Sequence, residues 1–253
     1  MRYFMEFSYL GTAYHGWQRQ PNALSIQEVM ESRMATLLGT DHLDVVAAGR
    51  TDAGVHARKM VAHFDREDLP ADFAHRLNAF LPDDIAIHGI RPVREGAHSR
   101  FDATSRSYEY HLVQEKNPFW HHGAHLVHAP LDFEAMNRAA SLLPGFEDFK
   151  AFSRSKTDVK TYRCDIREAQ WRPAPHGWVF CISADRFLRN MVRAVVGTLL
   201  MVGKGEWHPD DVKTIIKSRD RRRAGPSVPA KGLYLTDIQY PPGIYEDGEG
   251  ENR

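Results

Sequence analysis

Cysteine is scarce in this chain of 253 residues, which contains only Cys164 and Cys181. Two cysteines exclude a disulfide framework and a four-cysteine zinc site, and the two are expected to be core thiols. Long hydrophobic runs are also missing, because the longest, Ala194 to Gly203, is about half the length that spans a bilayer. The opening residues, MRYFMEFSYLGT, alternate like a strand and contain no apolar signal-peptide core. We therefore expect a cytoplasmic protein that does not associate with a membrane.

A surplus of either charge is missing as well. Lysine plus arginine amounts to 33 residues and aspartate plus glutamate to 33, so the formal net charge is zero. The segment EDGEGEN, Glu246 to Asn252, contains four acidic residues and no basic residue, and we expect it to be a solvated terminus. Contacts with a nucleic acid would therefore depend on local basic patches.

Hydrophobic periodicity predicts alternating strands and helices. A capping box, Ser25-Ile26-Gln27-Glu28, begins one helix, and Gly39 ends it. The expected strands are 1–9, 43–48, 58–65, 84–90, 105–113, 162–171, 178–185 and 233–239, and the expected helices are 26–38, 70–81, 132–143, 186–202 and 209–218.

This element order predicts an α+β fold. The order repeats in two ferredoxin-like α/β halves, which we expect to share a continuous, mainly antiparallel sheet with helices on one side. The halves are assigned to residues 1–100 and 101–241, and residues 242–253 form the acidic tail.

The segment GRTDAGVHA, Gly49 to Ala57, lies between two predicted strands. Its two glycines are expected to supply positive φ angles, so that the loop turns sharply and holds one side chain outward. Asp52 beside an arginine would stay ionised and could act as nucleophile or base. The alternative is an Asx turn, in which Asp52 only bonds its own backbone.

The segment RFDATSRSYEY leads into the strand at 105–113. With a period of two, Arg106, Tyr108, Tyr110 and Leu112 share one face of that strand. A tyrosine offers a ring on which a base can stack and a hydroxyl for a hydrogen bond. Ordinary aromatic packing in a half-buried strand is the alternative.

Three arginines, Arg186, Arg189 and Arg193, form a stripe at the start of the helix predicted over 186–202. Arginines there oppose the helix dipole, which a nearby anion would offset. Arg193 precedes the apolar run AVVGTLL, and a partly buried arginine needs a carboxylate partner, for which Asp52 is a candidate. The alternative is a solvated helix face.

Two further clusters carry weaker signals. The histidines His121, His122, His125 and His128 suggest a metal site, although Gly123 interrupts helical pairing and no acid lies nearby. The basic run Arg219 to Arg223 could meet phosphates or be a solvated helix end. No P-loop or GxGxxG motif is present.

Together these segments resemble the tRNA pseudouridine synthase A family. The matching motifs run in the family's order over residues 3 to 241: YLGTAYHGWQRQP with SIQE, GRTDAGVHA, RFDATSRSYEY, ISADRFLRNMVRAVVG and KGLYL. GRTDAGVHA is the specific one. Asp185 stands where asparagine is frequent in the family, and Arg186 stands where a small residue is common, which leaves the fine tRNA preference open.

The resemblance implies an enzyme that isomerises uridine to pseudouridine at positions 38, 39 and 40 in the tRNA anticodon stem-loop. It implies that Asp52 is the essential aspartate, that Tyr108 contacts the target base and that Arg193 pairs with Asp52. Arg50 matches the family's loop arginine, and Arg186 and Arg189 are expected to contact RNA phosphates in a basic cleft between the halves.

The resemblance also implies a homodimer that shares one tRNA across both subunits, and it implies neither a cofactor nor a metal. Two alternatives of other classes stay open. One is a non-catalytic RNA-binding module in which Tyr108 and Tyr110 stack bases. The other is a metallohydrolase built on the histidine cluster from His121 to His128.

Overall fold

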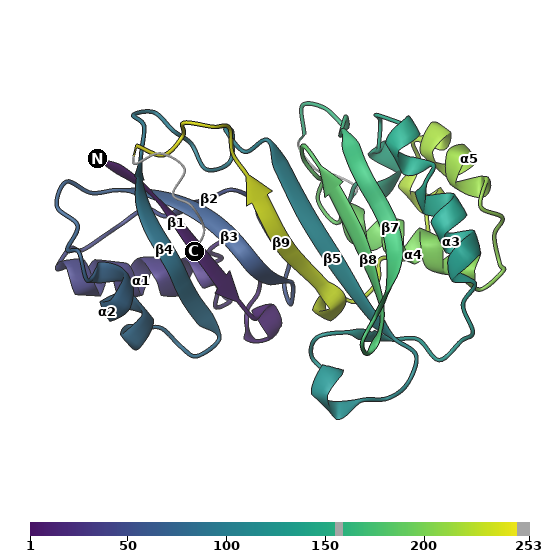
Figure 1. Cartoon of the computed structure of the whole chain (residues 1–253), viewed down its shortest axis with the longest axis horizontal. Helices are drawn as coiled ribbons and strands as arrows, with labels where there is room; N and C mark the ends of the chain where they lie inside the picture. The colour runs from purple at the N-terminus through teal and green to yellow at the C-terminus, as the bar shows by residue number, and fades with distance from the viewer. Residues whose placement is uncertain (155–158, 247–253) are drawn as a thin grey trace. The chain divides into compact units, whose positions relative to one another are not determined.

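The computed structural model describes residues 1–154 and 159–246. These residues form nine β-strands and five α-helices, which confirms the predicted α+β class. The chain divides into two compact units (Figure 1). The first unit comprises Met1–Thr104 together with the segment that begins at Leu235, and the second comprises Ser105–Tyr234.

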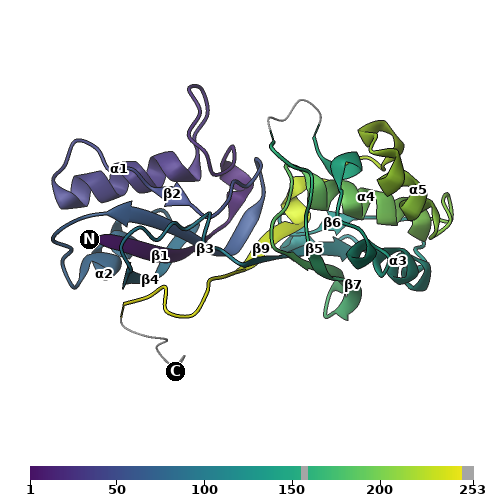
Figure 2. The same ribbon diagram turned by 90° about the horizontal axis from the view of Figure 1, so that it is seen from above.

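The first unit is built on a sheet with the strand order β4-β1-β3-β9, in which β1 is antiparallel to both of its neighbours. The short strand β2 pairs with β3. Helix α1 lies on one side of this sheet (Figure 2). Helix α2 contacts both α1 and β4. The elements are β1 (Arg2–Tyr9), α1 (Ile26–Leu38), β2 (Val46–Ala47), β3 (His56–Asp65), α2 (Phe73–Phe80), β4 (Ile85–Val93) and β9 (Leu233–Gln239).

The larger part of strand β9, from Leu235 on, belongs to the first unit, whereas the sequence assigned residues up to 241 to the C-terminal half. The reason is its pairing beside β3, where Lys59 Nζ lies 2.9 Å from Asp237 Oδ1. Residues beyond β9 also pack on this unit, since Ile244 is buried and its carbonyl accepts a hydrogen bond from Arg94 N. The rest of the expected acidic tail, 247–253, lies outside the described residues.

Helix α1 has the ends that its sequence predicts. Ser25 Oγ accepts a hydrogen bond from Glu28 N at 3.2 Å, and Gly39 ends the helix with a φ of 62°. The strand expected over 43–48 is reduced to β2, because Val45 N donates to the side chain of Glu31 instead of to a neighbouring strand.

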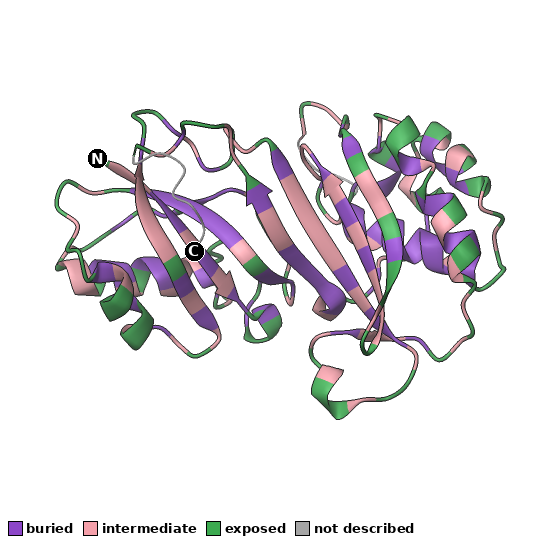
Figure 3. Ribbon diagram, viewed as in Figure 1, coloured by how far each residue is buried: buried purple, intermediate pink, exposed green. Residues whose placement is uncertain are grey.

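The second unit carries the strand order β5-β8-β7, and the short β6 runs parallel to β5. Helix α3 packs on β7 and α4, and Asp132 caps it by accepting from Ala135 N at 2.8 Å. Helix α4 is buried almost all round, so it forms the centre of this unit's core (Figure 3). The elements are β5 (Ser105–Val113), β6 (His125–Leu126), α3 (Phe133–Ala140), β7 (Ile166–Ala174), β8 (Gly177–Ala184), α4 (Met191–Gly203) and α5 (Asp211–Ser218).

The predicted start of α4 is wrong. The helix begins at Met191 rather than at 186, so Arg186 and Arg189 precede it and do not form a helical stripe with Arg193. Asn190 has a φ of 65°, a left-handed conformation that an α-helix cannot contain. Among residues 1–154 and 159–246, no helix combines the length and apolarity that crossing a bilayer requires.

Candidate active site

Asp52 opens a tight turn just before β3. Val55 N donates to Asp52 O at 3.1 Å, and Gly54 occupies the third turn position with a φ of 77°, as a type II turn requires. Gly49 does not have a positive φ, so the prediction that both glycines of the motif supply one is wrong. Asp52 is partly exposed and Arg50 is exposed, which leaves both side chains accessible within this unit.

Backbone and hydroxyl contacts fix both flanks of this turn. Thr51 is buried, and its Oγ1 is hydrogen-bonded to the Tyr9 hydroxyl at 2.7 Å. Its carbonyl accepts from Trp17 N at 3.2 Å, and Gly54 N donates to Tyr14 O at 3.3 Å. The turn is therefore held by the end of β1 and by the segment that follows it.

We call residues 10–17 the brace, because their backbone lies directly against the turn. Gly16 has a φ of 87°, and a Cβ atom there would lie 2.4 Å from Thr51 O. A Cβ atom at Gly11 would lie 2.0 Å from Val55 O. Only glycine permits such close approach of two backbone segments. The two glycines of the sequence motif LGTAYHGW permit this close approach, but support of the Asp52 turn by this motif was not predicted from the sequence.

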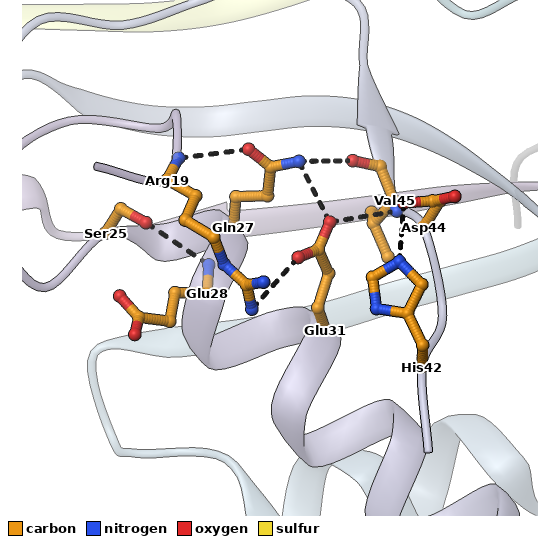
Figure 4. A network of polar contacts seen from close by, with 8 residues as sticks. All are labelled: Arg19, Ser25, Gln27, Glu28, Glu31, His42, Asp44 and Val45. Atoms are coloured by element: carbon orange, nitrogen blue, oxygen red, sulfur yellow. Dashed lines mark hydrogen bonds and ion pairs between the residues drawn. The ribbon is translucent and has the colours of Figure 1, made fainter. Parts of the chain in front are cut away.

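A polar network attaches the chain beyond the brace to α1 (Figure 4). Glu31 is buried, and its carboxylate accepts from Gln27 Nε2 at 2.9 Å and lies 3.2 Å from Arg19 Nη2. Arg19 N donates to Gln27 Oε1, and Gln27 N donates to Trp17 O at 2.9 Å. The buried charge is thus paired and hydrogen-bonded, as a stable buried carboxylate requires.

The two tyrosines predicted on one face of β5 have different environments. Tyr108 is partly exposed, and its ring lies edge-on to Phe187 with centroids 5.1 Å apart. Tyr110 is fully buried, its hydroxyl donates to Pro229 O at 2.9 Å, and burial raises its pKa. Only Tyr108 is therefore suited to contact a base.

Arg193 lies in the first turn of α4 and is held by the loop that follows α5. Its Nε donates to Val228 O at 2.7 Å, and its carbonyl accepts from Val228 N at 3.2 Å. We call residues 224–229 the strap. A Cβ atom on Gly197 of α4 would lie 1.7 Å from Pro226 O, so the strap backbone packs directly on the helix.

Polar side chains fix the strap from both sides. Arg221 donates to the carbonyl of Gly225 at 3.0 Å and to Ser227 Oγ at 2.9 Å. Asn190, the residue before α4, donates to the same Ser227 Oγ at 2.6 Å. Ser227 therefore connects the start of α4 with Arg221. This support for Arg193 was not predicted from the sequence.

The remaining predicted residues lie before α4. Arg186 is partly exposed, and its backbone N–H donates to Asp185 Oδ1 at 2.7 Å. Arg189 is exposed, and its carbonyl accepts from Arg154 N at 3.0 Å. Asp52 and Arg193 belong to different compact units, so their ion pair stays a prediction.

The histidine cluster offers no support for a metal site. Within 1–154 and 159–246, no three His, Cys, Asp or Glu side chains are grouped to hold a metal ion. His121 and His122 contact each other, whereas His125 lies on β6 beside the Tyr110 ring.

Burial raises the pKa of the Cys164 thiol to about 12, which suits an inert core thiol.

Comparison with known families identifies the class of protein. A family model described as tRNA pseudouridine synthase matches residues 6–102 and 139–241. The match covers more than half of the chain, so the chain belongs to the tRNA pseudouridine synthase family. The matched ranges include Asp52, Arg50 and Arg193, whereas Tyr108 lies between them.

Individual relatives are similar over nearly the whole chain, and each is named tRNA pseudouridine synthase A. The relative from Porphyromonas gingivalis is 52% identical over 250 residues, which cover 96% of this chain and 99% of the relative. The relative from Bacteroides fragilis is 50% identical over 249 residues, covering 97% and 98%. The relative from Bacillus subtilis is 39% identical over 245 residues, covering 95% and 99%.

Proposed function

We propose that this chain is a tRNA pseudouridine synthase that isomerises uridine at positions 38, 39 and 40 of the anticodon stem-loop. The observation that carries the proposal is the full-length similarity to relatives named tRNA pseudouridine synthase A. The family match also spans the Asp52 turn and the strap that holds Arg193, the two best-supported candidate side chains.

The reaction breaks the C1′–N1 bond of uridine and forms a C1′–C5 bond to the same sugar. The base loses its C5 proton and gains a proton at N1, so there is no net redox change and no redox cofactor is required. A partly exposed carboxylate can act as nucleophile at C6 or C1′, or as the base that removes a sugar proton. We assign this role to Asp52, and these three routes stay open.

The other site residues act on the RNA. The target uridine must leave the base stack, which costs a few kcal/mol, and contact with the Tyr108 ring returns part of that cost. We assign Arg193 to the ion pair that keeps Asp52 ionised and oriented. Arg50, beside Asp52, and Arg186 and Arg189, before α4, are assigned to contacts with the RNA.

At the level of the fold, we propose two ferredoxin-like halves with a continuous sheet, helices on one side and the active-site cleft between them. We also propose a cytoplasmic homodimer that shares one tRNA across both subunits. Sedimentation of the free protein and of its tRNA complex measures the stoichiometry.

The function is tested with an unmodified tRNA transcript labelled with tritium at C5 of uridine. Isomerisation releases the C5 proton, so wild-type protein releases tritium to water, and chemical mapping locates the pseudouridine. Asp52→Asn should release none while tRNA binding survives, because the substitution removes the charge but not the shape. Release at a near-wild-type rate would remove Asp52 from the mechanism.

A non-catalytic RNA-binding module is less well supported. That alternative uses Tyr108 and Tyr110 as neighbouring stacking platforms, and Tyr110 is fully buried with its hydroxyl bonded to Pro229 O. Tritium release by the wild-type protein separates the two functions, because a binding module releases none.

A further inference from the structure

A cavity of about 320 Å³ in the second unit is lined mainly by basic side chains. We call it the basic pocket. Its lining includes arginines of the basic run after α5, Arg219 to Arg223, for which the sequence predicted either a phosphate contact or a solvated helix end. The lining residues that matter here are Lys150, Arg154, Tyr162, Arg219, Arg221 and Arg222.

The charges of the basic pocket do not cancel. Among the residues that the structure describes, its five cationic side chains are accompanied by two carboxylates: Asp220 in the lining and Asp148, whose Oδ2 lies 3.1 Å from Arg219 Nη2. The guanidinium of Arg222 holds the pKa of Asp220 down to about 2, so that carboxylate is ionised. Positive charge is therefore in excess among the described residues of the basic pocket, and such an excess attracts a polyanion.

Arg219 carries a conformational penalty at this site. It follows α5 with a φ of 55°, and in the described part of the chain only Asn190 is another non-glycine residue with a positive φ. Glycine adopts this helix-ending conformation without strain. The ion pair of Arg219 with Asp148 is largely exposed, and exposed pairs contribute little to stability. A cation is favourable at a helix C-terminus, but that alone does not require this residue to accept backbone strain, and the strain points to a ligand for the guanidinium.

The basic pocket is connected to the support of Arg193 within the same unit. Arg221 in its lining donates to Ser227 of the strap, and Arg154 N donates to Arg189 O just before α4. An RNA that brings a uridine to Arg193 therefore has neighbouring backbone close to these arginines. Arginine forks match phosphate geometry, and the Tyr162 ring beside Lys150 offers a surface for a sugar or base.

We propose that the basic pocket binds phosphodiester groups of the tRNA backbone, as a contact surface separate from the candidate catalytic residues. The proposal rests on the proposed function for the identity of its RNA. The contacts are electrostatic and independent of sequence, so they position the tRNA without selecting the target uridine.

The test is tRNA binding by the full chain as a function of salt. The variant is Arg219→Gly combined with Arg222→Ala. The matched control combines Arg163→Ala with Arg172→Ala, because these exposed arginines of the same unit are also ion-paired, with Glu147 and Glu168. Affinity for an unmodified tRNA transcript is measured by fluorescence anisotropy across about 50 to 200 mM salt, the range over which phosphate contacts dominate.

Affinity falls as salt rises, so the slope of log affinity against log salt is negative. Loss of two phosphate contacts should make this slope shallower by about 1.4 to 1.8. The control should keep the wild-type slope. The pocket variant should also unfold at an unchanged or higher denaturant concentration, because glycine relieves the backbone strain at position 219. A wild-type slope in the pocket variant, or an equal loss of slope in the control, overturns the proposal.

The two proposals fail in different ways. If wild-type protein releases tritium from labelled tRNA but the pocket variant keeps the wild-type salt slope, only the pocket is refuted. If wild-type protein releases no tritium but the slope still becomes shallower in the pocket variant, the pocket stands and the catalytic function is refuted.

Discussion

Substitution Gly16→Ala tests whether the brace positions Asp52. The new Cβ atom would lie 2.4 Å from Thr51 O and 3.1 Å from Asp52 C, whereas ordinary contacts begin near 3.4 Å. The two backbone segments must therefore separate by about 1 Å. Thr51 cannot move freely because it is buried and its hydroxyl is bonded to Tyr9. The displacement is expected to pass into the turn that carries Asp52.

The expected cost falls mainly on the reaction rate. Displacing a reacting group by about 1 Å costs on the order of 100-fold in rate. The left-handed conformation adds about 1 to 2 kcal/mol of strain for any residue with a Cβ atom. A typical unfolding free energy of about 5 to 15 kcal/mol leaves the variant folded. We therefore expect about a 100-fold slower tritium release from 5-labelled tRNA, with tRNA affinity nearly unchanged.

Gly39→Ala is the matched control. Gly39 has a φ of 62° at the end of α1, and a Cβ atom there would meet nothing within 4 Å. The substitution adds the same kind of backbone strain without touching the turn. Urea unfolding should show a smaller loss of stability in Gly39→Ala than in Gly16→Ala, because only the Cβ atom at position 16 displaces neighbouring backbone, and tritium release should stay at the wild-type rate in Gly39→Ala. Equal rates in the two variants would refute the role of the brace.

Two further predictions concern the strap and the effect of pH. Ser227→Ala removes the hydroxyl that accepts hydrogen bonds from Asn190 and Arg221. Tritium release at saturating tRNA should therefore slow several-fold, whereas tRNA affinity should stay nearly unchanged. An unchanged rate would contradict the positioning of Arg193 by the strap. Burial lowers the pKa of His63 to about 4, so the unfolded chain binds more protons at this residue between pH 6.5 and 4. His63 should therefore contribute a fall of about 2 kcal/mol in the free energy of unfolding from pH 7 to pH 4.5. His63→Gln should flatten that pH dependence in urea titrations, and an unchanged slope would assign it to other groups.

The sequence predicted those elements whose signals are local. The ends of α1 follow from one hydroxyl and one glycine, because a cap is formed by residues within a few positions of each other. The Asp52 turn was also recognisable from its motif. Its chemistry needed the family resemblance, since an isolated turn of this composition is usually only structural.

The start of α4 was misplaced because the apolar spacing continues into the preceding loop. Periodicity cannot detect that Asp185 binds the Arg186 N–H or that Asn190 adopts a left-handed conformation. The brace was missed for a different reason. Contact between two backbone segments distant in sequence leaves no periodic pattern, and glycines are common in loops that make no such contact.

The two units hold their candidate side chains by the same physical means. In the first unit, glycine lets the brace touch the turn that carries Asp52, and in the second, Gly197 lets the strap touch the helix that carries Arg193. Contacts between backbones have no rotamers to lose, so the backbone that carries each group is fixed before RNA arrives. Because the brace contains none of the residues assigned to contact phosphates, its disruption should reduce turnover rather than affinity. Gly16→Ala and the basic-pocket variant should therefore have opposite profiles, the first slow but tightly bound and the second weakly bound but competent at saturating tRNA.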